Sequence, residues 1–255
     1  MNNGNILLVD VGNTSTCVAF HNKRSLSSVV RIDTNLCSKS VVRNIIKKKM
    51  KGARIAIGVL CSVVPRVNHI WIKELKRITN KNPLVVNYKM NIGVKLDYPK
   101  PQSIGADRLA NVCAVVEKYG YPVIVADFGT AVTFDVVNAE CAFIGGVIAP
   151  GLRMMTDYMA DRTALLPRIV LNGSVRRIGH NTKEAMKIGA IIGYRGLVHE
   201  ITQYIIKHNM IGEPKLVATG GLAETVLKNY CVKYLVDRTL TLRGLYRIYQ
   251  LNNKQ

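Results

Sequence analysis

The stretch ILLVDVGNTSTCVAF, residues 6–20, begins as a buried strand and then breaks its own pattern. Four apolar residues run directly into Asp10, and a segment of small and polar residues, 12–16, follows before apolar character returns. Glycine, asparagine and threonine favour tight turns, so the stretch predicts a β-hairpin. A carboxylate at the end of a buried strand also indicates that the turn binds something.

A second stretch repeats this pattern. VIVADFGTAVTFD, residues 123–135, again has four apolar residues, an aspartate, an apolar residue, a glycine and a threonine-rich turn. Asp10 and Asp127 are 117 residues apart, close to half of the 255-residue chain. This spacing favours duplication of one α/β unit.

The wider pattern agrees with two α/β halves. Several strand-like runs in each half are followed by alternating helix and strand, which is typical of a mixed α/β fold. We predict one half over residues 1–120 and the other over residues 121–255. The predicted strands are 5–11, 15–20, 29–32, 55–59 and 84–87, then 122–127, 132–137, 141–148, 215–218 and 232–235, and the predicted helices are 40–51, 67–79, 106–119 and 182–208.

The two turns have the chemistry of a phosphate site. Backbone N–H groups and hydroxyls in a glycine-containing turn can surround a phosphate chain closely. An aspartate repels phosphate but can hold a hydrated Mg²⁺ that binds the phosphates. Asp10 suits this role in the first turn, and Asp127 with Thr130 suits it in the second. The alternative is two ordinary hairpins with Asx-type turns.

Three further segments are candidates for contact with a ligand. In PQSIGADRLANVCAVVEKY, residues 101–119, a predicted helix carries Asp107 and Arg108 in its first turn. Asp107 is either a charge that the helix dipole favours or a general base beside a cation. The segments 143–152 and 216–226 contain glycine pairs, which allow close approach of a ligand or of another backbone segment.

Composition bounds the remaining possibilities. The six cysteines are scattered without a CxxC pair, which favours free thiols over disulfides or a zinc site. We find no signal peptide or membrane span and expect a cytoplasmic protein. The net charge of +20 points weakly to an anionic ligand. Nucleic acid is disfavoured, because aromatic residues are few and do not alternate with basic ones.

The motifs together resemble the type III pantothenate kinases, members of the acetate and sugar kinase, heat-shock chaperone and actin superfamily. DVGNT (10–14), GADR (105–108), DFGTAVTFD (127–135), GGVIAPG (145–151) and ATGG (218–221) occur in that family's order and span essentially the whole chain. The resemblance implies two duplicated ribonuclease-H-like (actin-like ATPase) halves with mixed sheets and flanking helices, with ATP in the cleft between them. It also implies a homodimer that transfers the γ-phosphate of ATP to pantothenate, the first step of coenzyme A synthesis.

The resemblance also assigns roles to individual residues. It implies that Asp107 is the catalytic base and that Asp127 binds a monovalent cation, K⁺ or NH₄⁺. The Mg²⁺ held through water by Asp10 follows from the chemistry of the first turn. It places pantothenate contacts on Tyr98, Gly105, Ala106, Asp107, Arg108 and Thr182, the last from the segment IGHNT (178–182). It places ATP contacts on Asp10, Val11, Gly12, Asn13, Thr14, Ser15, Thr16, Cys17 and Thr130.

One departure from the family pattern lies before GADR. The family usually has a Tyr-Asp-Asn-Pro-like stretch, where this chain has Tyr98-Pro99-Lys100-Pro101. Two alternative functions stay open: a superfamily kinase that acts on another small substrate, and a nucleotide-binding transcriptional accessory regulator without kinase activity. The three aspartates Asp10, Asp107 and Asp127 favour an active enzyme, because a regulator needs none of them chemically.

Overall fold

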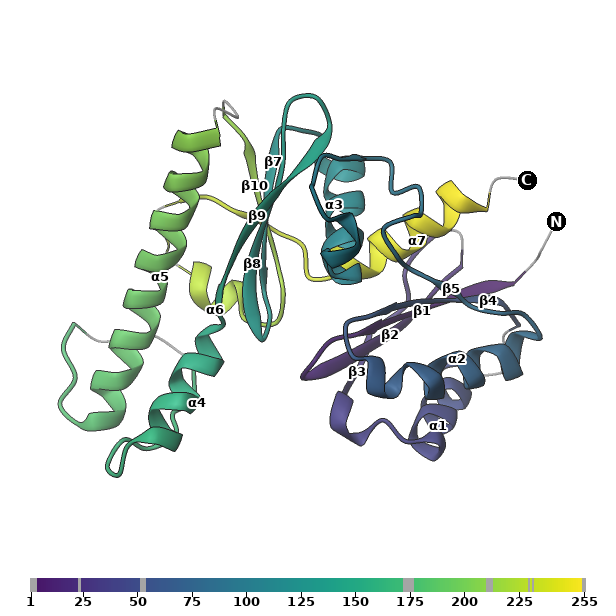
Figure 1. Cartoon of the computed structure of the whole chain (residues 1–255). Coiled ribbons are helices and arrows are strands. Elements are labelled where there is room, and N and C mark those ends of the chain that lie inside the picture. Colours follow the sequence, from purple (N-terminus) through teal and green to yellow (C-terminus); the bar gives the residue numbers. More distant parts are fainter. Residues whose placement is uncertain are drawn as a thin grey trace. The chain divides into compact units, whose positions relative to one another are not determined.

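The computed structural model describes residues 4–22, 24–50, 54–171, 177–209, 213–228, 230 and 232–253. The chain divides into two compact units (Figure 1). Unit 1 contains residues 1–118 and 239–255, and unit 2 contains residues 119–238. The last helix of the chain therefore belongs with the first half of the sequence.

Unit 1 is built on a mixed sheet in the order β3-β2-β1-β4-β5. The central strand β1 pairs antiparallel with β2 and parallel with β4. The elements are β1 (Asn5–Val11), β2 (Ser15–His21), β3 (Val30–Asp33), η1 (Thr34–Leu36), α1 (Lys39–Met50), β4 (Ile55–Ser62), α2 (Pro65–Thr79), β5 (Leu84–Val85), β6 (Lys95–Leu96), η2 (Pro101–Ser103), α3 (Ala106–Tyr119) and α7 (Leu240–Asn252).

Unit 2 repeats this arrangement. Its own strands lie in the order β11-β10-β7-β8-β9, with β7 antiparallel to β8 and parallel to β10. The elements are β7 (Val123–Phe128), β8 (Ala131–Val137), β9 (Ala142–Pro150), α4 (Leu152–Arg162), α5 (Thr182–Asn209), β10 (Lys215–Thr219), α6 (Ala223–Leu227) and β11 (Leu235–Val236). Each unit thus has three meandering antiparallel strands followed by two parallel ones, which confirms the predicted α/β fold with two mixed sheets and flanking helices.

Each sheet forms a core with helices on one face. In unit 1 the alternate residues Leu7, Val9 and Val11 of β1 pack with apolar side chains of α1 and α2. In unit 2, Phe128 of β7 and Phe134 of β8 belong to a core that α5 and α6 complete. Because side chains alternate along a strand, these cores leave the intervening positions, including Asp10 and Asp127, to the other face.

Helix α7 holds α3 in place within unit 1. It packs against β1 and β4, on the side of the sheet away from α1 and α2 (Figure 1). A Cβ added to Gly244 would lie 1.9 Å from the carbonyl oxygen of Ala110, so the two helices touch at backbone distance. The Thr241 hydroxyl also donates to Asn111 Oδ1 at 2.8 Å. This contact fixes the helix that carries Asp107 in its first turn.

The sequence patterns located most elements but not α4 or α7. The predicted helix 40–51 is observed as Lys39–Met50, and Lys51 lies outside the described residues. In place of the predicted strand 232–235, the structure has the two-residue strand Leu235–Val236, which overlaps the prediction only at Leu235. Five cysteines carry free thiols, and Cys231 lies outside the described residues; the free cysteines are Cys17, Cys37, Cys61, Cys113 and Cys141. Among the described helices, none has the length and apolar character needed to cross a membrane.

Candidate active site

The first phosphate-site candidate is the turn between β1 and β2. Val11 pairs with Thr16 across the hairpin, and the Gly12 N–H donates to the Ser15 carbonyl at 3.1 Å. Asn13 and Thr14 at the tip are exposed. The predicted hairpin is therefore present, with its polar tip accessible to a ligand.

Thr34 stabilises this turn through hydrogen bonds to its backbone. Its hydroxyl donates to the Gly12 carbonyl at 2.7 Å, and its N–H donates to the Thr14 carbonyl at 3.0 Å. The Thr16 hydroxyl, fully buried, lies 2.9 Å from the Thr34 hydroxyl. Two backbone acceptors that would repel phosphate are thus bonded to protein. Thr16, predicted to contact ATP, has its side chain in this supporting layer.

Asp10 lies at the end of β1, in register with Cys17 on β2 and Cys61 on β4. It is partly buried, whereas both cysteines are buried. The chain beyond β4 returns to the same place, since the Val63 N–H donates to the Val11 carbonyl at 3.1 Å. The carboxylate therefore lies at the edge of the sheet, next to the turn.

The segment Gly105–Arg108 reaches this same edge. A Cβ added to Gly105 would lie 3.5 Å from Val63 Cγ1 and only 2.5 Å from Asp107 Oδ1. Val63 bonds to Val11, so the start of α3 lies beside the end of β1. Two motifs that are about 90 residues apart in the sequence thus come together within unit 1.

Asp107 lies in the first turn of α3, where burial and the neighbouring Arg108 have opposite effects on the pKa of its carboxyl. Its Oδ1 accepts the N–H of Arg108 at 2.8 Å. Burial raises the pKa of the carboxyl above its ordinary value of 3.8, against the lowering effect of this bond and of the Arg108 charge. Arg108 itself is only 9% exposed. A carboxylate with a raised pKa is a better proton acceptor than an ordinary aspartate.

The loop before α3 contains the departure from the expected motif. Tyr98 is partly buried, and Pro99 and Lys100 are exposed. The Lys100 carbonyl accepts both the N–H and the hydroxyl of Ser103, at 2.9 and 2.7 Å. The unusual Pro-Lys pair therefore leads into a closed 3₁₀ turn, η2, directly before Ile104.

The second candidate turn joins β7 and β8 in unit 2. Asp127 pairs with Thr133, and the Gly129 N–H donates to the Ala131 carbonyl at 3.1 Å. Thr130 is exposed at the tip, and its carbonyl accepts the Gly151 N–H at 3.1 Å. A Cβ at Gly151 would lie 2.0 Å from that carbonyl oxygen. The glycine of Pro150-Gly151 thus fits against the turn rather than against a ligand.

The segment at the end of β10 also lies beside Asp127. In register with Asp127, β10 ends at Thr219, and Gly220 follows with φ +94°. A Cβ there would lie 2.5 Å from the Phe128 nitrogen and 2.6 Å from Asp127 Oδ1. The ATGG segment, a weak signal alone, therefore borders the same carboxylate as the hairpin.

Thr182 begins α5 and is exposed. The Asn181 side chain accepts the Glu184 N–H at 3.0 Å, and Glu184 Oε2 accepts the His180 N–H at 3.0 Å. The first bond is that of a capping box, whereas the Glu184 side chain bonds back one residue earlier, to His180 rather than to Asn181. Together these bonds give the segment IGHNT a fixed shape at the helix start.

Comparison with known proteins now identifies the family. The family model described as type III pantothenate kinase matches residues 6–204. A type III pantothenate kinase from Akkermansia muciniphila is 46% identical over 77% of this chain and 79% of its own length. The chain belongs to the type III pantothenate kinases. A second member, from Bacillus cytotoxicus, is 33% identical over 97% of this chain and 96% of its own length.

A solved structure shares the fold of this type III pantothenate kinase. A Campylobacter jejuni protein assigned to the Baf family of transcriptional activators superposes with a TM-score of 0.58, at 19% identity, over 96% of this chain and 97% of its own. At this identity the likeness concerns the fold alone.

The pantothenate kinase family implies ATP with a divalent metal. Among the described residues, no group of three His, Cys, Asp or Glu side chains forms a metal cage. Mg²⁺ fits this donor set, because it keeps several waters and commonly binds through one or two carboxylates and substrate phosphates. Asp10 offers such a carboxylate beside an exposed polar turn.

The structure also reveals residues that the sequence motifs did not point to. Thr34 holds the first turn, and Val63 places α3 beside it. Neither stands out in the sequence, because each acts through a contact formed only in the folded chain. Thr34 is the first residue of η1, and the side chain of the preceding Asp33 caps that short helix.

Proposed function

We propose that this chain transfers the γ-phosphate of ATP to the primary hydroxyl of pantothenate, giving 4′-phosphopantothenate, the first step of coenzyme A synthesis. The observation that carries this proposal is the position of Asp107. A partly buried carboxyl with a raised pKa lies in the same unit and at the same sheet edge as a turn suited to phosphate. That combination is what phosphoryl transfer to an alcohol requires.

The first turn binds the phosphates of ATP in this proposal. Its binding residues are Asp10, Val11, Gly12, Asn13, Thr14, Ser15, Thr16 and Cys17. The exposed tip contacts the phosphates directly, and the buried Thr16 acts through Thr34. Mg²⁺, held through water by Asp10, supplies charge neutralisation on the phosphate oxygens when it is bound.

Asp107 acts as the general base. It accepts the proton of the pantothenate hydroxyl as the oxygen attacks the phosphorus. Its raised pKa improves this proton transfer. The nearby Arg108 either orients Asp107 or binds the carboxylate of pantothenate. Gly105, Ala106, Tyr98 and Thr182 complete the proposed substrate contacts.

Asp127 binds the monovalent cation, K⁺ or NH₄⁺, and Thr130 contacts ATP. Three segments support a fixed carboxylate there: the turn at Gly129, the close approach of Gly151 to Thr130, and the left-handed Gly220. A rigid carboxylate beside an exposed turn can bind a monovalent cation without a dedicated cage. We further propose that the halves 1–120 and 121–255 are the two ribonuclease-H-like repeats, with α7 packed onto the first, and that the protein is cytoplasmic.

The protein forms a homodimer in this proposal, through the surface of α4 and α5. Four large apolar side chains of α4 are exposed: Met154, Met155, Tyr158 and Met159. On α5, a Cβ added to Gly189, Gly193 or Gly196 would meet nothing within 4 Å. A glycine within a helix costs about 1 kcal/mol relative to alanine. Close approach of a second copy explains three such glycines, because packing within the chain does not need them.

Charges on this face should separate the dimer. We expect Met155→Glu with Tyr158→Glu to give a monomer, because two carboxylates would lose their hydration in an apolar interface. Light scattering after gel filtration measures this. Leu36→Glu, at an exposed apolar residue of unit 1, should stay dimeric. A wild-type monomer, or an unchanged mass in the double variant, would disprove this interface.

The direct experiment is a coupled assay of ADP release with and without pantothenate, in K⁺ and in Na⁺. We expect pantothenate to raise ADP release and K⁺ to support a faster rate than Na⁺. The competing function, a nucleotide-binding regulator, predicts no dependence on pantothenate in either salt. If the chain is instead a kinase with another small substrate, ADP release should likewise not depend on pantothenate. It should rise when that other substrate is added.

A further inference from the structure

The charge of the chain is unevenly divided. Unit 1 carries 23 basic and six acidic residues, whereas unit 2 carries 13 and ten. The net formal charges are therefore +17 and +3. A uniform bias toward lysine in the composition would charge both units alike. Charge asymmetry between the parts of a chain instead indicates an anionic partner of the basic part.

The excess is concentrated around α1 and α2. Between Asp33 and Asp97 the sequence contains 14 basic residues and one acidic residue, Glu74. The apolar sides of both helices pack onto the sheet, and the helices lie side by side (Figure 1). The lysines whose exposure the structure describes there lie on the outside. Those exposed in and beside the two helices, among the described residues, are Lys39, Lys47, Lys48, Lys73, Lys76 and Lys81.

Within the described part of the chain, the side-chain ammonium groups of these six lysines have no hydrogen-bond or ion-pair partner. Glu74, the only acidic residue in this layer, is 1% exposed and already serves two arginines. The surface thus has one sign of charge. Such a field attracts anionic macromolecules over a distance of about a Debye length, ~8–10 Å at moderate salt.

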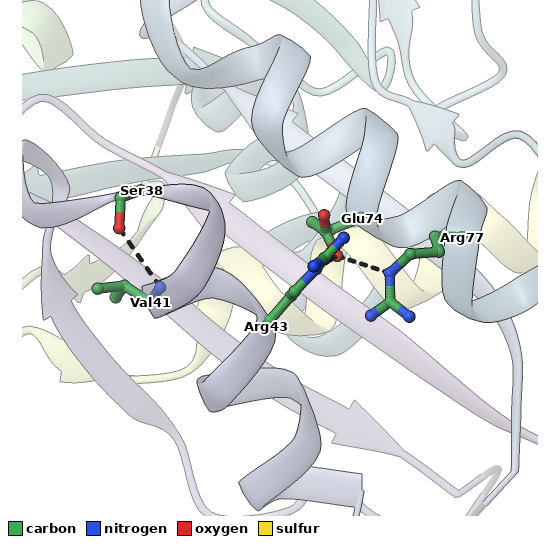
Figure 2. Close-up of polar contacts among 5 residues, drawn as sticks. All are labelled: Ser38, Val41, Arg43, Glu74 and Arg77. Atoms are coloured by element: carbon green, nitrogen blue, oxygen red, sulfur yellow. Dashed lines mark hydrogen bonds and ion pairs between the residues drawn. The ribbon is translucent and has the colours of Figure 1, made fainter.

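A fixed pair of arginines lies in this surface. Glu74 Oε2 accepts the Nε of Arg43 on α1 at 2.9 Å and the Nε of Arg77 on α2 at 2.8 Å (Figure 2). Burial raises the pKa of Glu74, but the two guanidinium bonds outweigh it and keep the carboxyl ionised. Each arginine is more than one third exposed. Their terminal nitrogens stay available, and guanidinium groups bind phosphate through such nitrogens.

The surface favours nucleic acid over a membrane. The large apolar side chains that are exposed in the described structure include none on α1 or α2, so the surface has no anchor to insert into a bilayer. Phosphate contacts from lysine and arginine need no aromatic residues. The scarcity of aromatic residues argues against stacking on bases, and so against sequence-specific or single-strand recognition, but not against backbone binding.

We propose that the outer surface of α1 and α2 binds the phosphate backbone of nucleic acid without sequence preference, with Arg43 and Arg77 as its fixed centre and the six lysines around them. This role is separate from the kinase reaction. It uses residues that have no part in the proposed active site.

Salt-dependent binding of a short labelled RNA duplex tests this proposal. The full-length protein is titrated into the duplex between about 50 and 200 mM salt, and fluorescence anisotropy is measured. We expect Lys47→Gln, Lys73→Gln and Lys76→Gln together to lower the slope of log K against log salt by ~2–3, because each lost phosphate contact removes about 0.7–0.9. If both proteins bind equally at about 1 M salt, this corresponds to weaker binding of the variant by about 10²–10³-fold at about 100 mM salt.

The matched control changes the same charge on unit 2. Lys207, Lys228 and Lys233 are exposed there, and their triple replacement with glutamine should leave both slope and affinity near wild type. Arg77→Lys keeps the positive charge but removes the planar guanidinium group that Glu74 holds in place. We therefore expect weaker binding of the duplex with an unchanged slope of log K against log salt. Pantothenate-dependent turnover, measured alongside, should stay at the wild-type rate in the lysine variants.

Three results would overturn the proposal. One is the absence of duplex binding by the wild type at about 50 mM salt. Another is an equal loss of affinity in both lysine triples, which would reflect overall charge alone. The third is binding to vesicles containing phosphatidylserine but not to the duplex, which would assign the surface to a membrane.

Discussion

Replacing Asp107 with asparagine should lower the pantothenate-dependent rate by about 10²–10⁴-fold, because a general base contributes a factor of that size. Affinity for ATP should stay unchanged, since the proposed ATP contacts lie elsewhere. The folded pKa of Asp107 is raised, so at neutral pH the ionised carboxylate costs stability, and this cost disappears as pH falls through that pKa. Asparagine carries no charge, so the unfolding free energy of Asp107→Asn should equal or exceed that of the wild type.

Steady-state kinetics, ATP titration calorimetry and urea unfolding measure these three effects. Asp97→Asn is the matched control, because Asp97 is an exposed aspartate in the same unit and should leave the rate unchanged. The wild-type kcat/KM should fall on the acid side around a pKa above 3.8, the ordinary value for aspartate. Full activity in Asp107→Asn would show that another group accepts the proton.

Replacing Gly220 with alanine should both destabilise unit 2 and impair the cation site. Alanine at φ +94° is strained by ~1–3 kcal/mol. Its Cβ would also lie 2.5 Å from the Phe128 nitrogen, and relief of such overpacking typically costs about 1–3 kcal/mol. The neighbouring Asp127 carboxylate, 2.6 Å from that Cβ, would have to move. Stimulation of turnover by K⁺ should therefore fall.

Urea unfolding and the K⁺ dependence of ADP release measure this loss. Gly129→Ala is the control for stability, because a Cβ there would meet its nearest atom, the Ala131 carbonyl oxygen, at 3.4 Å. This variant should change the unfolding free energy by less than ~0.5 kcal/mol. If Gly220→Ala were as stable as wild type with normal K⁺ stimulation, Asp127 would not be positioned as described.

The sequence predicted the two hairpins well because their signals are local. Apolar runs, Asp10 or Asp127, and a glycine-containing turn all occur within about 15 residues, and period-two alternation is strong there. The start of α3 was predictable for the same reason. The family resemblance then supplied roles that these local patterns had left open, above all the choice between a cap charge and a base at Asp107.

Contacts between distant residues were not predictable. Thr34 binds a carbonyl 22 residues earlier in the chain, that of Gly12, and Gly244 fits against Ala110. No local pattern records which residue will fill such a position. Helix α4 escaped prediction because its apolar residues Met154, Met155, Tyr158 and Met159 are exposed in the chain, so they do not mark a face that packs on the core. A second copy covering them would explain that pattern.

ATP turnover by this chain should depend on pantothenate. Its most direct measurement is ADP release in K⁺ with and without pantothenate, with mass spectrometry of the second product. This dependence predicts ADP release that rises with pantothenate and one phosphopantothenate formed for each ADP. ADP release that is unaffected by pantothenate, with no phosphorylated pantothenate detected, would contradict it.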